Sequence, residues 1–129
     1  MGAQKRWILL EHTGAPDDPE GIHFDLMVED NHGCRSWRLN EIPRLDGPAQ
    51  GAIPLPVHQF KWLDHLDGEV SRGRGHARRV MAGFFFEDLP ENDSEPVEIQ
   101  LHSNGIIGKL TIKNFLCTLS SISSSSFIP

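Results

Sequence analysis

The sequence has few cysteines and no long apolar run. Its 129 residues include only Cys34 and Cys117, which are too few and too far apart in the chain for the disulfide framework of a small secreted domain. No apolar stretch approaches the ~20 residues that span a bilayer. The first residues, MGAQKRWILLEH, also lack the apolar run of a signal peptide. We therefore expect a protein of the reducing cytoplasm without membrane attachment.

The chain also lacks an excess of positive charge. It has 12 lysines and arginines against 18 acidic residues, which gives a formal net charge of −6 at pH 7. A phosphate-bearing partner must then meet a local basic patch, because the whole chain does not attract nucleic acid. We expect any binding to DNA to be weak and sensitive to salt.

A helical period of apolar side chains is missing as well. Short apolar or alternating runs are separated by turn residues, and they cover residues 6–12, 22–29, 34–39, 79–86, 96–102 and 105–115. This pattern predicts an all-β fold, a small closed antiparallel β-barrel with long loops and at most a short helix near residues 60–66. The length indicates one domain over residues 1–114, and we expect the serine-rich residues 115–129 to be a disordered, low-complexity tail.

A histidine and a carboxylate stand two residues apart in the alternating stretch GIHFDLMVED, residues 21–30. In an extended chain His23 and Asp25 share one face. His12 ends the preceding predicted strand, so antiparallel pairing across the loop TGAPDDPEG would bring it beside them. Two imidazoles and a carboxylate suit manganese, iron or zinc. The alternative is an ordinary solvated face of a half-exposed strand.

Two further segments carry groups that suit phosphate. The segment SRGRGHARR, residues 71–79, contains four arginines and two glycines, which predicts either a phosphate-contacting loop or a solvated basic turn. Its arginines are Arg72, Arg74, Arg78 and Arg79. In HQFKW, His58 and Trp62 are four residues apart; they form either a phosphate-contacting imidazole with an aromatic neighbour or a core tryptophan with an incidental histidine.

Six segments, taken in order, carry a resemblance to a known family. They are EHTG, IHFDLMVE, RSWRL, VHQFKWLDHLDGEV, GRGHARRV and IQLHSNGIIGKLTI, and together they extend over residues 6–113. They resemble the 3′-phosphoesterase domain of bacterial DNA ligase D, a repair enzyme of non-homologous end joining, and they are most similar to its short stand-alone relatives. The resemblance implies a β-barrel hydrolase with a divalent metal, typically manganese although zinc or another ion is compatible. Such a hydrolase removes a 3′-phosphate or a terminal ribonucleoside. The implied partners are a nucleic-acid 3′ end or another phosphate ester, and DNA ligase and polymerase repair proteins.

The resemblance also implies roles for individual residues. His12, His23 and Asp25 fall on the metal-binding positions. His58 falls on the histidine that contacts the scissile phosphate, so that His58, His23 and Asp25 form the expected catalytic set. Trp62 stands where the family generally has a tyrosine that touches the same phosphate.

The sequence departs from the family at several phosphate-binding positions. Met27 replaces an arginine, and Glu41 and Gln50 stand near lost basic residues of the connecting loop. Arg72, Arg74, Arg78 and Arg79 are the expected replacements, and of these Arg72 and Arg74 are the predicted phosphate-binding residues. These losses leave two alternatives open: a catalytically inactive DNA-end or protein-docking module that keeps the barrel and the metal, and a small β-domain without metal.

Overall fold

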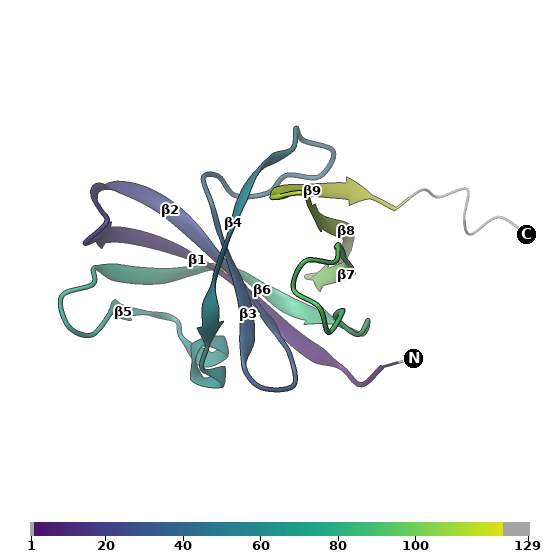
Figure 1. Cartoon of the computed structure of the whole chain (residues 1–129), viewed down its shortest axis with the longest axis horizontal. Helices are drawn as coiled ribbons and strands as arrows, with labels where there is room; N and C mark the ends of the chain where they lie inside the picture. Colours follow the sequence, from purple (N-terminus) through teal and green to yellow (C-terminus); the bar gives the residue numbers. More distant parts are fainter. Residues whose placement is uncertain (1, 123–129) are drawn as a thin grey trace, which may run out of the picture.

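The computed structural model describes residues 2–122, and almost all of its regular structure is β-strand (Figure 1). The described elements are β1 (Lys5–Ala15), β2 (Asp18–Glu29), β3 (Cys34–Leu39), β4 (Gln50–His58), the 3-10 helix η1 (Phe60–Asp64), β5 (Asp67–Glu69), β6 (His76–Phe85), β7 (Val97–Ser103), β8 (Ile106–Lys113) and β9 (Leu116–Ser121). The predicted all-β class is confirmed. The short helix lies where the sequence predicts it.

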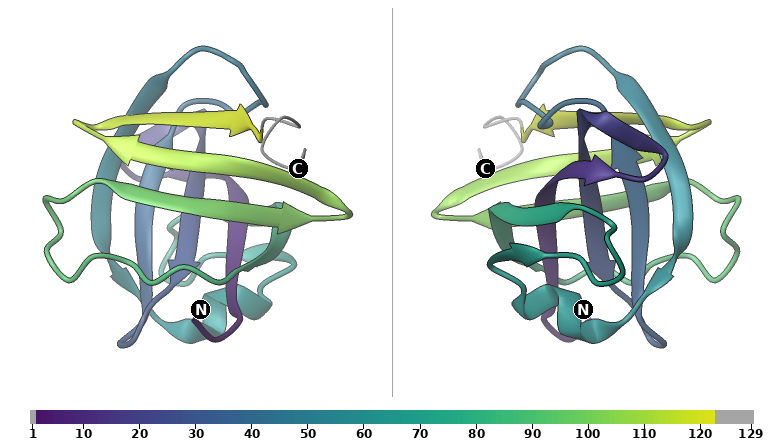
Figure 2. Two further views of the ribbon diagram at one scale, coloured as in Figure 1. Left: turned by 90° about the vertical axis from the view of Figure 1, so that its right-hand side faces the viewer. Right: turned by 90° about the vertical axis from the view of Figure 1, so that its left-hand side faces the viewer.

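The strands form one antiparallel sheet that closes on itself. The order is β1-β2-β3-β4-β9-β8-β7-β6-β5, and a further pairing of β1 with β6 completes a barrel-like ring in which β5 is an additional strand beside β6. The two side views show this ring, with η1 and β5 on its outside (Figure 2). Among the described residues, no helix has the length and apolar character needed to cross a membrane.

The hydrogen bonding around the ring is uneven. β1 pairs with β2 from Trp7 to Ala15, whereas the described register of β4 with β9 contains only Gln50–Cys117 and Gly51–Leu116. Further hydrogen bonds support this seam: the N–H of Ala52 donates to the carbonyl oxygen of Phe115, and Ser121 donates to the carboxylate of Asp46. Side-chain packing inside the ring adds to them. Each large apolar side chain that is fully buried contributes roughly 1.5–3 kcal/mol.

Buried apolar side chains lie on both faces of β1 and β2. We call the larger group, inside the ring, the inner core; its members include Trp7, Leu9, Leu26, Val28, Trp37 and Phe85. We call the group outside the ring the outer cluster; it consists of Ile8, Leu10, Met27, Cys34, Leu63, Val70 and Ala77. Burial of both faces explains why Trp7–Leu10 is a continuous apolar run rather than an alternating one.

The predicted boundary of the tail is wrong. Residues 116–121, which the sequence assigned to a disordered tail from 115 to 129, form β9 and pair with β8 along their whole length. Cys117 is buried in the inner core and Leu119 packs against it. Within this serine-rich segment, Cys117 and Leu119 face the inner core, and the segment continues the sheet as a strand beside β8. The remainder of the predicted tail, residues 123–129, lies outside the described residues.

Candidate metal centre

The β1–β2 hairpin brings together the three residues that the sequence proposed as ligands. His12 and His23 are direct cross-strand partners, and Asp25 lies two residues along β2 on the same face. The connection is shorter than expected, because β1 extends to Ala15 and β2 begins at Asp18. The long loop predicted between residues 13 and 21 is therefore wrong. The register shifts between Thr13 and Ala15, but His12 and His23 pair directly on the strand side of this irregularity.

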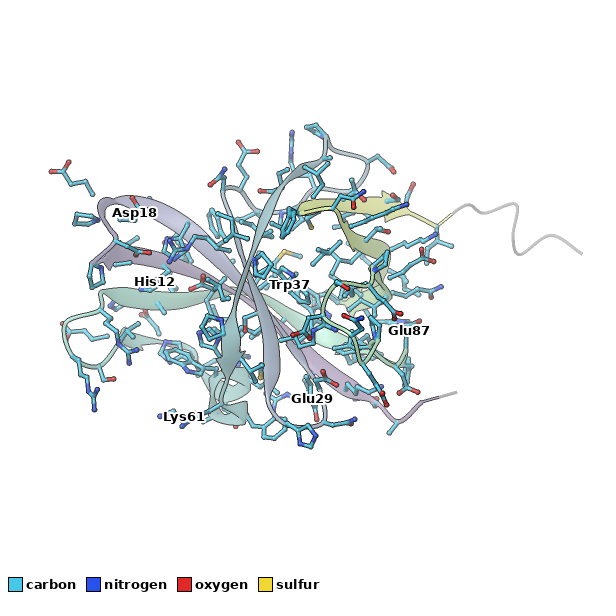
Figure 3. All side chains as sticks on the ribbon, viewed as in Figure 1. His12, Asp18, Glu29, Trp37, Lys61 and Glu87 are labelled. Atoms are coloured by element: carbon cyan, nitrogen blue, oxygen red, sulfur yellow. The ribbon has the colours of Figure 1, made fainter. Side chains whose placement is uncertain are left out.

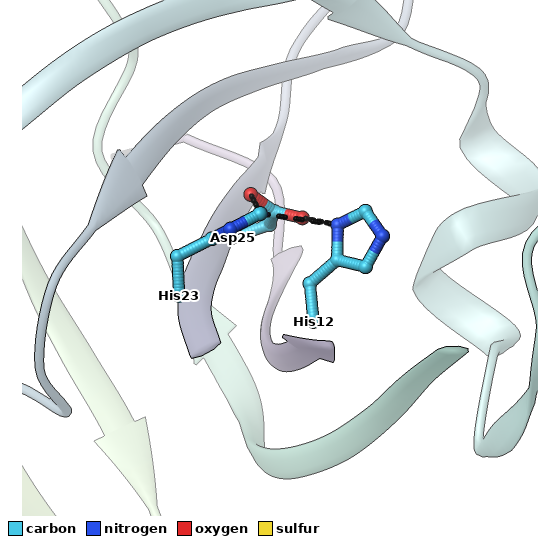
Figure 4. A group of neighbouring side chains, drawn as sticks. All are labelled: His12, His23 and Asp25. Atoms are coloured by element: carbon cyan, nitrogen blue, oxygen red, sulfur yellow. Dashed lines mark hydrogen bonds and ion pairs between the residues drawn. The ribbon is translucent and has the colours of Figure 1, made fainter. Parts of the chain in front are cut away.

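The candidate ligand atoms lie at separations that suit one metal ion. His12 Nδ1 is 3.1 Å from Asp25 Oδ2 and 3.1 Å from His23 Nε2, and His23 Nε2 is 3.4 Å from Asp25 Oδ1 (Figure 4). Ligand atoms about 2.1 Å from a metal are about 3.0 Å apart in an octahedral arrangement and about 3.4 Å apart in a tetrahedral one. The two distances to Asp25 involve different carboxylate oxygens, so Asp25 would bind through both oxygens or after a small rotation. Taken one atom per residue, the candidate ligand atoms lie within 4.8 Å of one another, which is close enough to surround one ion.

The hydrogen bond on the far side of the His12 ring determines what its near side offers. His12 Nε2 is 2.7 Å from the carbonyl oxygen of Arg74. Since a carbonyl only accepts, Nε2 carries the hydrogen, and Nδ1 of the neutral ring presents a lone pair to the carboxylate of Asp25. Two such electron-rich atoms attract each other only through a positive charge between them. A proton on His12 supplies this positive charge, and the hydrogen bond to Asp25 accordingly raises the pKa of His12. A metal ion between the two atoms would supply a positive charge in the same place.

The other ligands are buried and incompletely satisfied. His23 and Asp25 are 2% and 7% exposed. Asp25 Oδ1 has no hydrogen-bond partner among the residues that the structure describes. A buried carboxylate oxygen without a partner is costly, and a cation satisfies it. The donor set and this unsatisfied oxygen therefore fit a divalent metal. The alternative of an ordinary solvated strand face is wrong for these residues.

A small pocket opens beside the candidate ligands. It has a volume of about 130 Å³, and His12, Asp25, His58, Trp62 and Arg74 contribute its polar and aromatic walls. The apolar part of the lining consists of Leu10, Met27, Val70 and Ala77. The structure thus brings the histidine predicted to contact phosphate and the three predicted ligands to one place.

His58 and Trp62 form one side of this pocket. His58 ends β4, and Trp62 lies in η1 with its ring edge-on to the imidazole, at 6.3 Å between centroids. Burial lowers the pKa of His58, although the charge of Asp25 opposes this shift. The ring is therefore neutral at pH 7, with one N–H donor and one lone pair.

The four arginines of the predicted basic segment make different contacts. Arg74 lines the pocket, where its guanidinium donates to the carbonyl oxygen and hydroxyl of Ser71. Arg72 is exposed in the same turn and does not line the pocket. Arg78 pairs with Glu11 at 3.2 Å. Arg79 donates to the carbonyl oxygens of Leu63 and His65, and so ties η1 to β6.

The turn that carries Arg74 passes very close to β1. Gly75 has φ of 94°, and a Cβ at this position would collide with the carbonyl oxygen of Thr13. Only glycine fits both the backbone conformation and the space. The glycines of this segment were predicted to admit an anion. At Gly75 the close neighbour is instead the backbone of β1, and this contact brings the Arg74 carbonyl to His12.

Met27 does not lie on a solvated surface. It is 2% exposed and belongs to the outer cluster with Leu63 and Val70. The side-chain amide of Gln50 accepts from the backbone N–H of Glu41 and donates to the carbonyl oxygen of Glu41, and neither residue lines the pocket. The residues at the three positions where the resemblance predicts cations thus serve packing and loop closure.

Sequence reasoning missed Asp18. Its Oδ2 lies 3.5 Å from His23 Nδ1. The sequence placed it in a loop, and only the hairpin register shows it beside His23. The hydrogen bond between His12 and the Arg74 carbonyl could not be predicted from the sequence either, because every residue has a backbone carbonyl.

Comparisons with known proteins give this chain no family. No protein-family model matches the sequence. No curated protein matches it either.

Proposed function

We propose that this protein is a divalent-metal-dependent phosphoesterase that trims 3′ ends of nucleic acid, removing a 3′-phosphate or a terminal 3′-ribonucleotide in DNA end repair. One observation carries the proposal: a ring nitrogen of His12, a ring nitrogen of His23 and the carboxylate of Asp25 converge beside a pocket that also contains His58 and Arg74. The order of the six sequence segments supports the class of substrate.

His12, His23 and Asp25 would hold the metal, with manganese as the first choice and zinc compatible with the same ligands. When bound, a divalent cation supplies Lewis-acid stabilisation of the charge on a phosphoryl oxygen. The two histidines need to be neutral to bind it. The Arg74 carbonyl favours this state of His12 by fixing its hydrogen on Nε2.

The remaining pocket residues act on the phosphoryl group. Arg74 binds a phosphoryl oxygen through its guanidinium. The neutral ring of His58 donates its N–H to a second oxygen or accepts a proton from water at its other nitrogen. Trp62 has no hydroxyl, so it contributes an apolar wall that limits the movement of His58 and excludes water.

The small volume of the pocket and the acidic chain bear on the substrate. A pocket of about 130 Å³ is below the usual size of a ligand site, so we propose that only a terminal phosphoryl group enters it while the rest of the nucleic acid stays outside. The net charge of −6 disfavours long contacts with a polyanion. Both features favour action at an end over binding along a duplex.

The second candidate function is a catalytically inactive DNA-end or protein-docking module. Met27 favours it, because this buried thioether stands where the resemblance places a phosphate-binding arginine. Arg74 is the only described cation that lines the pocket, so phosphate binding has a single charged side chain besides the metal.

The test is hydrolysis, with manganese, of a primer-template that bears a 3′-phosphate or a single 3′-ribonucleotide. We expect activity in the wild type, its loss in Asp25→Ala, and a decrease of about 10²–10⁴-fold in His58→Ala. His32→Ala is the matched control, because His32 is exposed in the β2–β3 turn and does not line the pocket. An inactive wild type that binds manganese would support the docking module instead. A wild type that binds no metal would contradict both.

A further inference from the structure

One ring nitrogen of His23 is buried without a partner. The side chain of His23 is 3% exposed, and its Nε2 faces the candidate ligands His12 and Asp25. Its Nδ1 has no hydrogen-bond partner within residues 2–122. A neutral histidine binds a metal through Nε2 only when its hydrogen is on Nδ1, so this nitrogen needs an acceptor.

Asp18 is placed to be that acceptor. Its Oδ2 is 3.5 Å from His23 Nδ1, slightly longer than a hydrogen bond. The carboxylate is 42% exposed, so it has room for the small rotation that would close this gap. Figure 3 shows Asp18 and His12 labelled at the same end of the molecule. The neighbouring carboxylate, Asp17, is already engaged, because it pairs with Arg38 at 2.9 Å.

Gly21 makes room for this arrangement. A Cβ at Gly21 would collide with both carboxylate oxygens of Asp18. The φ of Gly21 is not among the positive values of the described residues, and the colliding atoms belong to a flexible side chain, so an added Cβ would displace the carboxylate of Asp18 rather than the backbone. The three residues Asp18, Gly21 and His23 thus form one local unit on β2.

We propose that Asp18 is a positioning residue for the metal site: it accepts the hydrogen of His23 Nδ1 and thereby fixes Nε2 as the ligating nitrogen. This inference rests on the metal site of the proposed function. Asp18 does for His23 what the Arg74 carbonyl does for His12. Carboxylates and backbone carbonyls commonly orient metal-binding histidines in this way, and their loss typically weakens metal binding 10–100-fold.

The first experiment measures manganese affinity by calorimetry in the full chain. Asp18→Ala is expected to weaken binding about 10–100-fold, and Asp18→Asn less, because an amide oxygen can still accept the hydrogen. Gly21→Ala is expected to weaken binding in the same direction by displacing the carboxylate. Asp17→Asn is the matched control, since it removes the same charge one residue away. Equal affinities in the wild type and Asp18→Ala would overturn the proposal.

The second measurement reads the tautomer of His23 directly. In ¹⁵N-labelled, zinc-loaded protein, two-bond nitrogen–proton correlations are expected to place the hydrogen on Nδ1 in the wild type. In Asp18→Ala we expect a mixture of tautomers before zinc is added. A hydrogen on Nε2 in the zinc-loaded wild type would overturn the proposal even if Asp18→Ala had lost affinity by misfolding. A wild type that binds metal with the expected tautomer but hydrolyses nothing would contradict the proposed phosphoesterase alone.

Discussion

The inner core and the outer cluster lie on opposite faces of the same strands and differ in what they enclose. The inner core is a set of apolar side chains surrounded by the whole ring. The outer cluster includes Leu63 of η1 and Val70, and it lies beside the group formed by the half-buried His12 and the buried His23 and Asp25. The ring supplies stability on one face. On the other face, the same β1–β2 register brings together polar atoms that are buried or half-buried, and we propose that a cation binds them.

Truncation in the inner core is expected to have the largest effect. Phe85 is fully buried, so Phe85→Ala should lower the free energy of unfolding by about 3–5 kcal/mol. Phe115→Ala is the matched control: this side chain is 70% exposed, and its loss should change stability by no more than about 0.5 kcal/mol. Denaturant titration measures both. Similar losses in the two variants would mean that the ring does not enclose a packed core.

Placing an arginine at position 27, where the sequence resemblance predicts one, tests whether the outer cluster is closed. Met27→Arg should destabilise the protein by about 3 kcal/mol without any gain in hydrolysis, because it buries a charge among Leu63 and Val70. Ile22→Arg, on an exposed part of the same strand, should be nearly neutral. If Met27→Arg kept wild-type stability and became more active, the outer cluster would be open enough to admit an arginine to the site.

Manganese should stabilise the folded protein only by binding to the group of His12, His23 and Asp25. Manganese at about 100 times its dissociation constant should raise the free energy of unfolding of the wild type by about 2.7 kcal/mol. It should leave Asp25→Ala unchanged, since this variant lacks the ligand shared by both histidines. Thermal unfolding with and without manganese measures the difference. Equal stabilisation of both proteins would show that manganese binds elsewhere.

A rise in pH should lower the stability of the metal-free protein but increase the stabilisation that manganese provides. The hydrogen bond to Asp25 raises the pKa of His12 above 6.5. In the metal-free protein, the resulting stabilisation is fully present below pH 6.5 and is lost as the pH rises through the raised pKa. Metal binding removes this proton, so the gain from manganese should grow with pH over the same range. Melting temperatures on both sides of this range, with and without manganese, test the two signs.

The smallest expected effect is a difference in reactivity between the two cysteines, because Cys117 belongs to the inner core and Cys34 to the outer cluster. Burial raises the pKa of both Cys34 and Cys117 to about 11, so both thiols should react slowly with alkylating reagents near neutral pH. Cys34 lies in the outer cluster beneath η1, which has no strand ladder to hold it. We expect Cys34 to be labelled before Cys117 in the native protein, as mass spectrometry can show. Labelling of Cys117 first would mean that the inner core opens more readily than the outer cluster.

The strand pattern and the candidate ligands could be predicted from the sequence because both depend on alternation. His23 and Asp25 share a face in any extended chain, and antiparallel pairing then selects His12. Burial of that face could not be predicted, since η1 and Val70 come from distant segments and their contact depends on the tertiary fold. Cys117 and Leu119 were missed because the serines around them dominate the composition.

The close approach of Gly75 to β1 determines where this protein tolerates engineering. At Gly105, in the β7–β8 turn, an added Cβ meets nothing within 4 Å, so a reporter peptide inserted there should extend into solvent. The same peptide inserted beside Gly75 would separate the turn from Thr13 and remove the carbonyl of Arg74 from His12. Both turns contain a glycine at positive φ, yet only the first is a suitable attachment point for a label that must leave the site intact.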